Sequence, residues 1–216
     1  MTLWRRAAAD GLGTAFLLAA VVGSGIMGER LAGGNVALAL LANALATGFA
    51  LTALIMAFGA RSGAHFNPVV TLALAIRGDF SRREVFHYLL AQFAGALLGV
   101  GAAHAMFDLS IVQAGTQART GAAQWWSEIV ATFGLVWVVL SCSAKQAPFA
   151  VGAYIAAAYW FTASTSFANP AVTLARCLTD TFAGIRPADV VPFVAAQAIG
   201  AALALMADRA LREPQV

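Results

Sequence analysis

The stretch FANPAVTLAR, residues Phe167–Arg176, nearly repeats the stretch HFNPVVTLAL, residues His65–Leu74. Both copies contain Asn-Pro-x-Val-Thr-Leu-Ala, and their asparagines, Asn67 and Asn169, are 102 residues apart. Asn followed by Pro is a common helix start, because the Asn side chain caps the helix and Pro at the first helical position loses no hydrogen bond. Two such starts in a chain of 216 residues predict a molecule built from two related halves.

The composition of the chain is that of a membrane protein. Hydrophobic residues make up 61% of it, charged residues only 11%, and the mean hydropathy is +0.78, whereas soluble domains carry about 25% charged residues. The formal net charge of +3 is scattered along the chain, which argues against a nucleic-acid partner, since phosphate binding needs a basic face. No residues have the spacing of a catalytic or metal-binding constellation. We therefore expect no enzyme, no cofactor and no metal site.

Six apolar stretches are long enough to cross a bilayer, which takes about 20 residues. They are roughly residues 7–27, 36–58, 84–106, 125–143, 148–165 and 189–208. Both Asn-Pro motifs lie between these stretches, and the apolar runs that follow them, 69–76 and 171–178, are only about half a span long. Irregular backbone at membrane depth persists only where protein buries it or where it lines a wet cavity. The two runs therefore predict re-entrant half-helices.

Basic residues predict the orientation, because Lys and Arg concentrate in cytoplasmic segments. With both termini in the cytoplasm, nine of the thirteen basic residues are cytoplasmic. The other four are Arg30, Arg119, Arg176 and Arg186. Three predicted spans separate the two motifs, so the motifs enter from opposite sides and the repeat is inverted. A second match agrees: Asp10 opens the first span and Glu128 the fourth, each with Thr four residues later.

The chain has six predicted spans, two half-helices with paired Asn-Pro motifs, the acid-x-x-x-Thr openings and the lead-in Ser-Gly-x-His-x-Asn-Pro. In these features the sequence resembles the aquaporin and aquaglyceroporin family, the major intrinsic proteins. The resemblance implies an all-α membrane protein with six transmembrane helices plus two re-entrant half-helices in an inverted repeat. It implies one channel domain over residues 1–216, with repeats at approximately 1–107 and 120–210. It also implies a homotetramer in the bilayer of the bacterial inner membrane.

By the same resemblance, the half-helices meet at the membrane midplane as two triplets, Asn67-Pro68-Val69 and Asn169-Pro170-Ala171. The two asparagine amides are then expected to donate hydrogen bonds to a passing solute. Helix N-termini carry partial positive charge, and two of them aimed at one point disfavour a cation there. Such a channel passes neutral polar molecules and rejects ions and protons.

Three titratable residues, two of them at the edges of predicted spans, have a structural and a functional interpretation. The resemblance makes Asp10 and Glu128 acceptors for backbone amides of the re-entrant segments, which need partners; a proton relay is the alternative. His65 lies two residues before Asn67 and is expected near the inner vestibule. There it is either structural or, since His titrates near neutrality, a pH gate.

The predicted selectivity filter departs from the family pattern. Most members place Arg three residues after the second motif's Asn, and this chain has Val172 there. The opening is therefore expected to be wider and less polar, because a guanidinium contributes bulk, five donors and a fixed charge. The rest of the ring maps onto Phe49, Ser166 and, in the fifth span, either Tyr159 or Ala157.

Arg176 lies one helical turn beyond Val172 on the same face. It could return a positive charge to the outer vestibule. The alternatives are that it extends to the membrane interface, as long basic side chains do, or that it pairs with Asp180.

A pore without the filter Arg resembles the bacterial branch of the family associated with arsenic resistance, and the run NPAVTLARCLTDTFAGI is similar to that branch. The resemblance implies passive conduction of arsenite, as neutral As(OH)3, of antimonite and of glycerol-like polyols, with some water. Two alternatives remain open. One is a water-selective channel, and the other is a secondary transporter, since inverted repeats and broken helices also occur in transporters.

Overall fold

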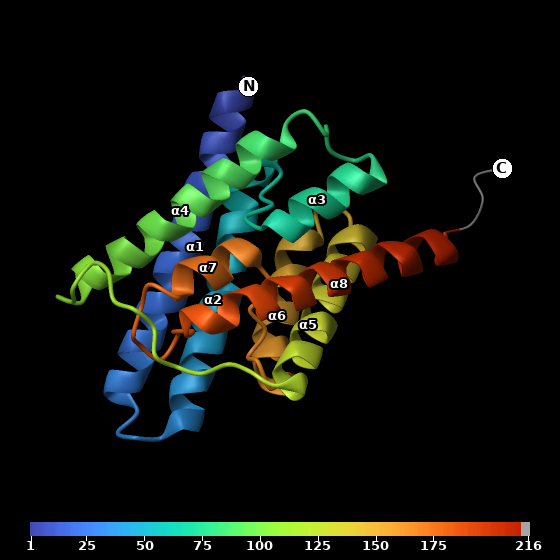
Figure 1. Cartoon of the computed structure of the whole chain (residues 1–216). Coiled ribbons are helices and arrows are strands. Elements are labelled where there is room, and N and C mark those ends of the chain that lie inside the picture. The colour runs from blue at the N-terminus through green and yellow to red at the C-terminus, as the bar shows by residue number, and fades with distance from the viewer. Residues whose placement is uncertain (213–216) are drawn as a thin grey trace.

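In the computed structural model, which describes residues 1–212, these residues form eight helices and no strand (Figure 1). In chain order the helices are α1 (Leu3–Leu31), α2 (Val36–Ser62), α3 (Pro68–Arg77), α4 (Val85–Met106), α5 (Ala122–Ser141), α6 (Ala147–Phe161), α7 (Pro170–Arg176) and α8 (Pro187–Leu211). The end of the predicted 1–216 domain, residues 213–216, lies outside the described residues.

Six of the helices correspond to the predicted spans, and α3 and α7 are the predicted half-helices. Five helices, α1, α2, α4, α5 and α8, are long and apolar enough to cross a membrane. Helix α6 has only 15 residues and is shorter than the predicted span 148–165, because the backbone becomes extended at Thr162 and leads into the second re-entrant segment. Half-helix α7 likewise ends at Arg176, two residues earlier than predicted.

The two halves of the chain, α1–α4 and α5–α8, pack in the same pattern. Helix α1 packs against α2 and α4, and α5 packs against α6 and α8. Each half-helix contacts the last helix of both halves: α3 touches α4 and α8, and α7 touches α8 and α4. Helices α2 and α6 pack against each other across the halves. The predicted aquaporin fold, an all-α inverted repeat, is confirmed.

The half-helices distinguish the two ends of the molecule. The end that we call the α3 side holds the start of α1, the α3–α4 and α5–α6 connections and the end of α8; Arg6 pairs there with Glu84 at 2.9 Å. The end that we call the α7 side holds the α1–α2, α4–α5 and α7–α8 connections. There the Arg186 amide donates to the Gln117 carbonyl at 2.8 Å.

Glycine permits close approach between the long helices at equivalent places in the two halves. A Cβ atom on Gly95 of α4 would lie 2.0 Å from the carbonyl oxygen of Gly11 in α1. A Cβ atom on Gly200 of α8 would lie 2.4 Å from the carbonyl oxygen of Ile129 in α5. Small residues allow such contacts between membrane helices, and here they fix the α1–α4 and α5–α8 pairs.

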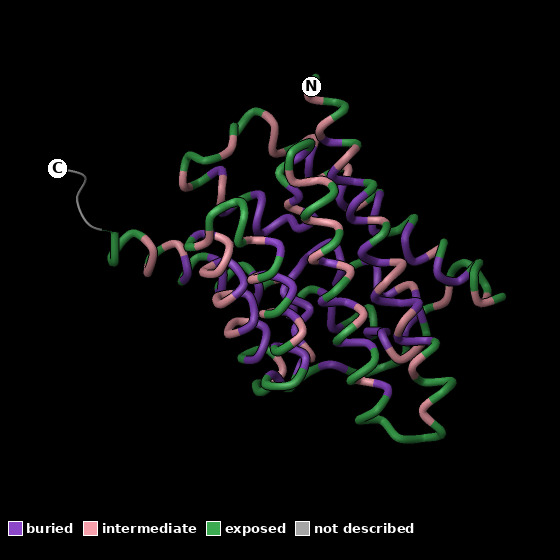
Figure 2. Tube along the Cα trace, turned by 180° about the vertical axis from the view of Figure 1, so that it is seen from behind, coloured by how far each residue is buried: buried purple, intermediate pink, exposed green. Residues whose placement is uncertain are grey.

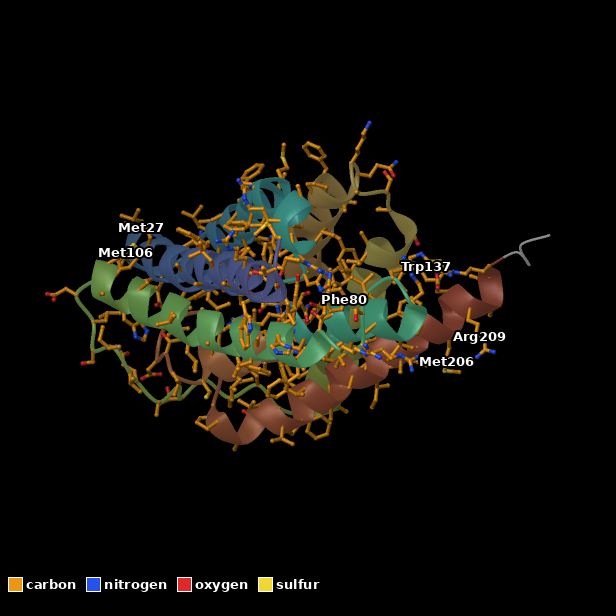
Figure 3. All side chains as sticks on the ribbon, turned by 90° about the horizontal axis from the view of Figure 1, so that it is seen from above. Met27, Phe80, Met106, Trp137, Met206 and Arg209 are labelled. Atoms are coloured by element: carbon orange, nitrogen blue, oxygen red, sulfur yellow. The ribbon has the colours of Figure 1, made fainter. Side chains whose placement is uncertain are left out.

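Burial is arranged around the centre of the bundle. Figure 2 shows the buried residues gathered in the interior, with exposed residues along the outer faces of the helices and in the connections. Large apolar side chains such as Met27, Met106 and Met206 are exposed and point away from the bundle (Figure 3). An apolar outer surface over helices of this length is suited to contact with lipid.

Candidate functional site

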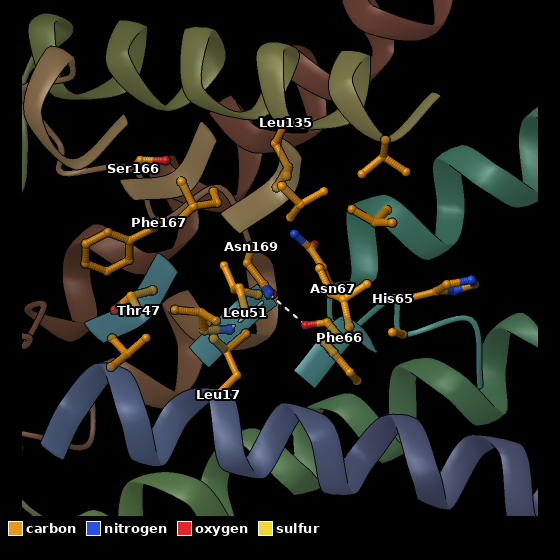
Figure 4. Close-up of a pocket in the computed structure, with 18 of the residues that line it drawn as sticks. Leu17, Thr47, Leu51, His65, Phe66, Asn67, Leu135, Ser166, Phe167 and Asn169 are labelled. Atoms are coloured by element: carbon orange, nitrogen blue, oxygen red, sulfur yellow. Dashed lines mark hydrogen bonds between the residues drawn. The ribbon is translucent and has the colours of Figure 1, made fainter. Parts of the chain in front are cut away.

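The two asparagines of the repeated motif meet at the centre of the bundle and bind each other's segments. The side chain of Asn67 donates to the Ala168 carbonyl at 2.7 Å. That of Asn169 donates to the Phe66 carbonyl at 2.8 Å, the bond drawn as a dashed line in Figure 4. The Oδ1 atoms accept from Val69 N and Ala171 N, at 3.0 Å each, and so cap α3 and α7. An amide group has two hydrogens, so each asparagine retains one that these bonds do not use.

The residues that precede each asparagine have an unusual backbone. Ala64 and Phe66 in the first half, and Ser166 and Ala168 in the second, have positive φ angles between 47° and 52°. Such angles are uncommon for residues other than glycine, and the two pairs occupy equivalent places 102 residues apart. This conformation presents the Phe66 and Ala168 carbonyls to the opposite asparagine, which is why the two halves interlock at this point.

A buried carboxylate supports the first re-entrant segment. Asp10 accepts hydrogen bonds from the backbone amides of His65 and Phe66 at 2.9 and 3.1 Å, and from Ser62 Oγ at 2.9 Å. Gln92 Nε2 donates to the same carboxylate at 2.7 Å. The carboxylate therefore compensates the amides that the irregular backbone leaves without helical partners.

Glu128 does the same for the second segment. It accepts from the backbone amides of Phe167 and Ala168, each at 2.9 Å, and from Ser164 Oγ and Gln197 Nε2, each at 2.6 Å. Neither Asp10 nor Glu128 lines the central cavity. Both acids thus contact the re-entrant backbone and not the cavity.

Gln92 and Gln197 were missed by the sequence analysis. Besides the carboxylates, they donate to Thr71 Oγ1 at 2.9 Å and to Thr173 Oγ1 at 2.8 Å. Each threonine in turn donates to the carbonyl of the asparagine four residues before it. The signal that could have found the two glutamines is their spacing of 105 residues, close to that of the asparagines.

A cavity of about 110 Å³ runs past the paired asparagines. It is lined by residues of four long helices, both re-entrant segments and both half-helices, and Figure 4 shows Leu17, Leu51 and Leu135 around Asn67 and Asn169. Of the six predicted midplane residues, only the two asparagines line it. Pro68 and Pro170 form the first turns of α3 and α7. Val69 and Ala171 are buried in the core.

At the α7 end, the cavity is lined by Tyr159, Ser166, Val172 and Arg176, as well as Thr47 and Phe167. Tyr159 is buried and its hydroxyl lies 3.3 Å from Thr47 Oγ1, whereas Ala157 is exposed. Tyr159, rather than Ala157, is therefore the residue of α6 that borders the cavity. The Ser166 hydroxyl is buried and has no hydrogen-bond partner among the described residues.

The placement of Phe49 in the filter is wrong. Its side chain is 71% exposed on the outer face of α2, and Thr47 and Leu51 of the same helix line the cavity instead. An α-helix turns about 100° per residue, so a shift of two positions moves a side chain to nearly the opposite face. Thr47 is therefore the residue of α2 that borders the α7 end of the cavity, beside Tyr159.

His65 lines the cavity at its α3 end. Its Nδ1 atom lies 3.1 Å from Thr71 Oγ1, and its ring packs against Phe80 and Tyr88 with centroids 4.8 and 5.3 Å away. In Figure 4, His65 and Phe167 stand at opposite ends of the cavity, with the asparagines between them.

Arg176 neither extends to the interface nor pairs with Asp180. Only 2% of it is exposed, and its Nε atom donates to the Ala183 carbonyl. Asp180 instead accepts from the backbone and hydroxyl of Thr116 at 3.0 and 2.7 Å. The chain after α7 folds back over Arg176 and provides a backbone carbonyl for its Nε atom. Arg176 therefore neither reaches the membrane interface nor forms an ion pair with Asp180.

These features define a multi-pass membrane protein in which two half-helices from inverted repeats meet around a narrow central cavity. The model of the major intrinsic protein family matches residues 1–159. The chain belongs to the major intrinsic protein family.

Individual relatives agree with that membership. The aquaglyceroporin AqpS of Rhizobium meliloti (strain 1021) is 53% identical over 215 residues, which cover 98% of this chain and 92% of the relative. Aquaporin NIP2-1 of Zea mays is 35% identical over 147 residues, covering 67% of this chain and 44% of that protein. The X-ray structure of the Plasmodium falciparum aquaglyceroporin covers 95% of each chain with a TM-score of 0.75 at 21% identity, which supports the fold.

Proposed function

We propose that the protein is a passive channel for small neutral solutes: glycerol-like polyols, arsenite and antimonite, with some water. The observation that carries the proposal is the cavity that runs from His65, past Asn67 and Asn169, to Tyr159, Ser166 and Val172. Its walls are mostly apolar, and a small number of polar side chains, among them the two asparagines, border it. A solute with hydroxyl groups on a carbon skeleton, or a compact trihydroxide, suits such a surface.

Electrostatics supports the exclusion of ions and protons. The N-termini of α3 and α7 both begin at the paired asparagines, so their partial positive charges converge on the cavity. The remaining hydrogen of each asparagine amide is available to a passing oxygen. A water that accepts both such bonds is poorly placed to pass a proton along a file of waters.

Val172 supports a solute larger than water. It leaves an apolar side chain where most family members place a guanidinium, and the relative of 53% identity is named an aquaglyceroporin. Arsenite and antimonite are included because the sequence around α7 resembles the arsenic-resistance branch. The filter in this proposal consists of Thr47, Tyr159, Ser166, Val172 and Arg176, with His65 near the opposite entrance.

The setting of the channel is part of the proposal. It forms a homotetramer in the bacterial inner membrane, with both termini and the α3 side in the cytoplasm. It catalyses no reaction and uses no cofactor, and transport follows the solute gradient. A coupled transporter is disfavoured because, among the described residues, no carboxylate lines the cavity. Water selectivity is the second candidate, favoured by Arg176 and by the Thr47–Tyr159 hydrogen bond, which both restrict the α7 end.

Permeability measurements on liposomes containing the purified protein test the proposal. Stopped-flow light scattering measures water and glycerol, and arsenic analysis of the liposomes measures arsenite. We expect glycerol and arsenite rates well above those of protein-free liposomes, without a change when a sodium or proton gradient is imposed. Transport of water alone would instead support the water-selective candidate, and a rate that follows the ion gradient would support a transporter.

A further inference from the structure

Two buried arginines share one aromatic ring at the α7 end of the cavity. The guanidinium carbon of Arg176 lies 3.4 Å from the centroid of the Phe167 ring, and that of Arg119 lies 4.9 Å from the same centroid. The residues are 2% and 7% exposed. We call Arg119, Phe167 and Arg176 the arginine–phenylalanine cluster. Attraction between a cation and a ring face is strongest where water is excluded, as it is here.

Backbone carbonyls hold both guanidinium groups in place. Arg119 Nε donates to the Gly184 carbonyl at 2.9 Å, and its Nη1 donates to the Ser164 carbonyl at 3.3 Å. Arg176 donates to the Ala183 carbonyl. Within residues 1–212, neither side chain forms a salt bridge with a carboxylate; Glu128, which bonds Ser164 and the re-entrant backbone, acts on both guanidinium groups only through its charge, without a direct bond. Burial lowers the pKa of Arg119 to about 10, which leaves it charged at neutral pH.

The two arginines differ in their access to the cavity. Arg176 lines it together with Phe167, but Arg119 does not. Within the described residues, Nε makes the only hydrogen bond of the Arg176 side chain. The two terminal nitrogens have no protein partner there and are not fully buried. The end of the guanidinium therefore faces the space that a solute crosses. The buried, unpaired Ser166 hydroxyl borders the same space.

We propose that Arg119 and Phe167 are positioning residues that hold Arg176 as the cation of the selectivity filter. The inference rests on the proposed channel function and deepens it. The Phe167 ring provides the surface on which Arg176 lies, and Arg119, a like charge near the same ring, repels the Arg176 guanidinium and so keeps it from turning away from the cavity. The filter thus regains, from one turn further along α7, the positive charge that Val172 does not supply.

The position of this charge predicts a separable effect on ions and neutral solutes. A cation that enters the α7 end meets the positive charge of Arg176 at short range and in a medium of low dielectric constant, where charge repulsion is strong. A neutral polyol is not repelled, and its oxygens can accept from the free guanidinium nitrogens. Loss of the charge should therefore admit cations without stopping glycerol.

The test compares sodium leak and glycerol permeability in liposomes for the native chain and for Arg176→Gln, Arg119→Gln and the double variant. We expect Arg176→Gln to raise the ratio of sodium to glycerol flux by about tenfold or more, as removal of a nearby charge in a low-dielectric mouth implies. Arg119→Gln should raise it less. Because Arg119 acts through Arg176, the double variant should leak no more than Arg176→Gln alone.

Arg186→Gln is the matched control. Arg186 lies on the same side of the molecule and pairs with Asp189 at 2.9 Å, and the described structure shows no contact between it and Phe167 or the cavity. Its loss removes the same charge and should leave the flux ratio at the native value. An equal effect of Arg119→Gln and Arg186→Gln, or full additivity of the Arg119 and Arg176 variants, would overturn the positioning role.

Two further variants keep the test decisive. Arg119→Lys retains the charge but not the planar group that bonds Gly184 and Ser164, so it should restore ion exclusion only in part. Phe167→Leu removes the shared ring and should leak like Arg119→Gln; it carries the test if Arg119→Gln does not fold. If the native chain conducts no solute, the proposed function fails. If it conducts glycerol and every variant excludes sodium equally, only this inference fails.

Discussion

Val172 borders the α7 end of the cavity. It lines the cavity together with Tyr159 and Ser166, and a branched apolar side chain there contributes no donor. Replacing it with Arg adds bulk and five donors to a cavity of only about 110 Å³, which Arg176 already lines. The effect of this position is therefore mainly steric, and neutral solutes of different size should report it.

We predict that Val172→Arg lowers glycerol and arsenite permeability by about tenfold or more, the factor that corresponds to about 1.4 kcal/mol in a barrier, while water falls less. Stopped-flow light scattering and arsenite uptake in liposomes measure the three rates. Val172→Leu, which enlarges the side chain by one methylene, is the control and should reduce glycerol only slightly. Unchanged glycerol flux in Val172→Arg would mean that the narrowest point lies elsewhere.

The hydrogen bonds of Asp10 lead to a second prediction about a single residue. Its carboxylate accepts four hydrogen bonds, from two backbone amides, Ser62 and Gln92. An Asn in its place offers one oxygen and turns an NH2 group toward donors. Because an unsatisfied buried group costs about 1–3 kcal/mol, Asp10→Asn should lower the free energy of unfolding by that amount, measured by denaturant unfolding in detergent.

Glu29→Gln is the control for Asp10→Asn, since Glu29 is exposed and a surface change of this kind usually stays within about 0.5 kcal/mol. The proton-relay alternative makes the opposite prediction. It requires Asp10→Asn to abolish a proton flux of the native protein in liposomes and to leave the unfolding free energy unchanged.

Single residues could be predicted from the sequence where a repeated motif marked them. They could not be predicted where the role depends on the direction in which a side chain points. The asparagines and the two acids follow from repeated patterns. In the structure the asparagines meet at the centre of the bundle, and each acid accepts from the backbone of one re-entrant segment. The predicted filter residue Phe49 lies two positions away from Thr47, because no repeated motif indicates which face of α2 points inward. Arg119 is a single charge in an irregular connection, and only the folded chain shows that it reaches the Phe167 ring.

Among the elements, the half-helices were the most predictable, and the segments that lead into them the least. Asn-Pro followed by half a span of apolar residues defines α3 and α7 from sequence. The positive φ angles of Ala64, Phe66, Ser166 and Ala168 have no sequence signal, since Gly and Asn are the residues that usually mark them. The cost of such a conformation, about 1–3 kcal/mol each, is offset by the bonds to Asp10 and Glu128.

The long helices depend on glycine at their contact points, and α4 offers a matched pair for a test. A Cβ at Gly95 would lie 2.0 Å from the Gly11 carbonyl oxygen, whereas one at Gly101 would make an ordinary contact of 3.5 Å with Ile111. We predict that Gly95→Ala destabilises the protein by about 1–3 kcal/mol, as overpacking does. Gly101→Ala should be neutral or stabilising by up to about 1 kcal/mol, since Ala favours helix.

Thermal unfolding in detergent and the yield of folded protein measure the two glycine variants. A Gly95→Ala protein as stable as the native chain would show that α1 and α4 can separate at no cost. The close α1–α4 packing would then not be a requirement of the fold.

In the whole molecule, the two-fold relation holds at the centre and is broken at the two ends. The asparagines, the supporting acids and the glutamines have equivalents in both halves. At the ends, the Ser62 carbonyl accepts from the Tyr88 hydroxyl at 2.8 Å, and its counterpart, the Ser164 carbonyl, accepts from Arg119. The repeat in the sequence predicted the symmetric centre. It could not predict the asymmetry, because that arises from residues without a counterpart in the other half.

The two ends also differ in their number of exposed basic residues, and this difference predicts the orientation of the molecule in the membrane. Nine basic residues belong to the α3 side. Of the four assigned to the α7 side, Arg119 and Arg176 are buried, which leaves only Arg30 and Arg186 at that surface. Basic residues in short connections favour the cytoplasm, so the structure makes the imbalance larger than the sequence count implies. The α3 side is therefore predicted to be cytoplasmic.

Cysteine labelling of intact spheroplasts tests this orientation. In a chain with Cys142 and Cys177 replaced by Ser, a single new cysteine is placed either at Ser81, exposed on the α3 side, or at Ser110, exposed on the α7 side. A membrane-impermeant maleimide should label Ser110→Cys in intact cells and Ser81→Cys only after permeabilisation. The reverse pattern would place Val172 and the arginine–phenylalanine cluster at the cytoplasmic entrance, where they would screen solutes leaving the cell first.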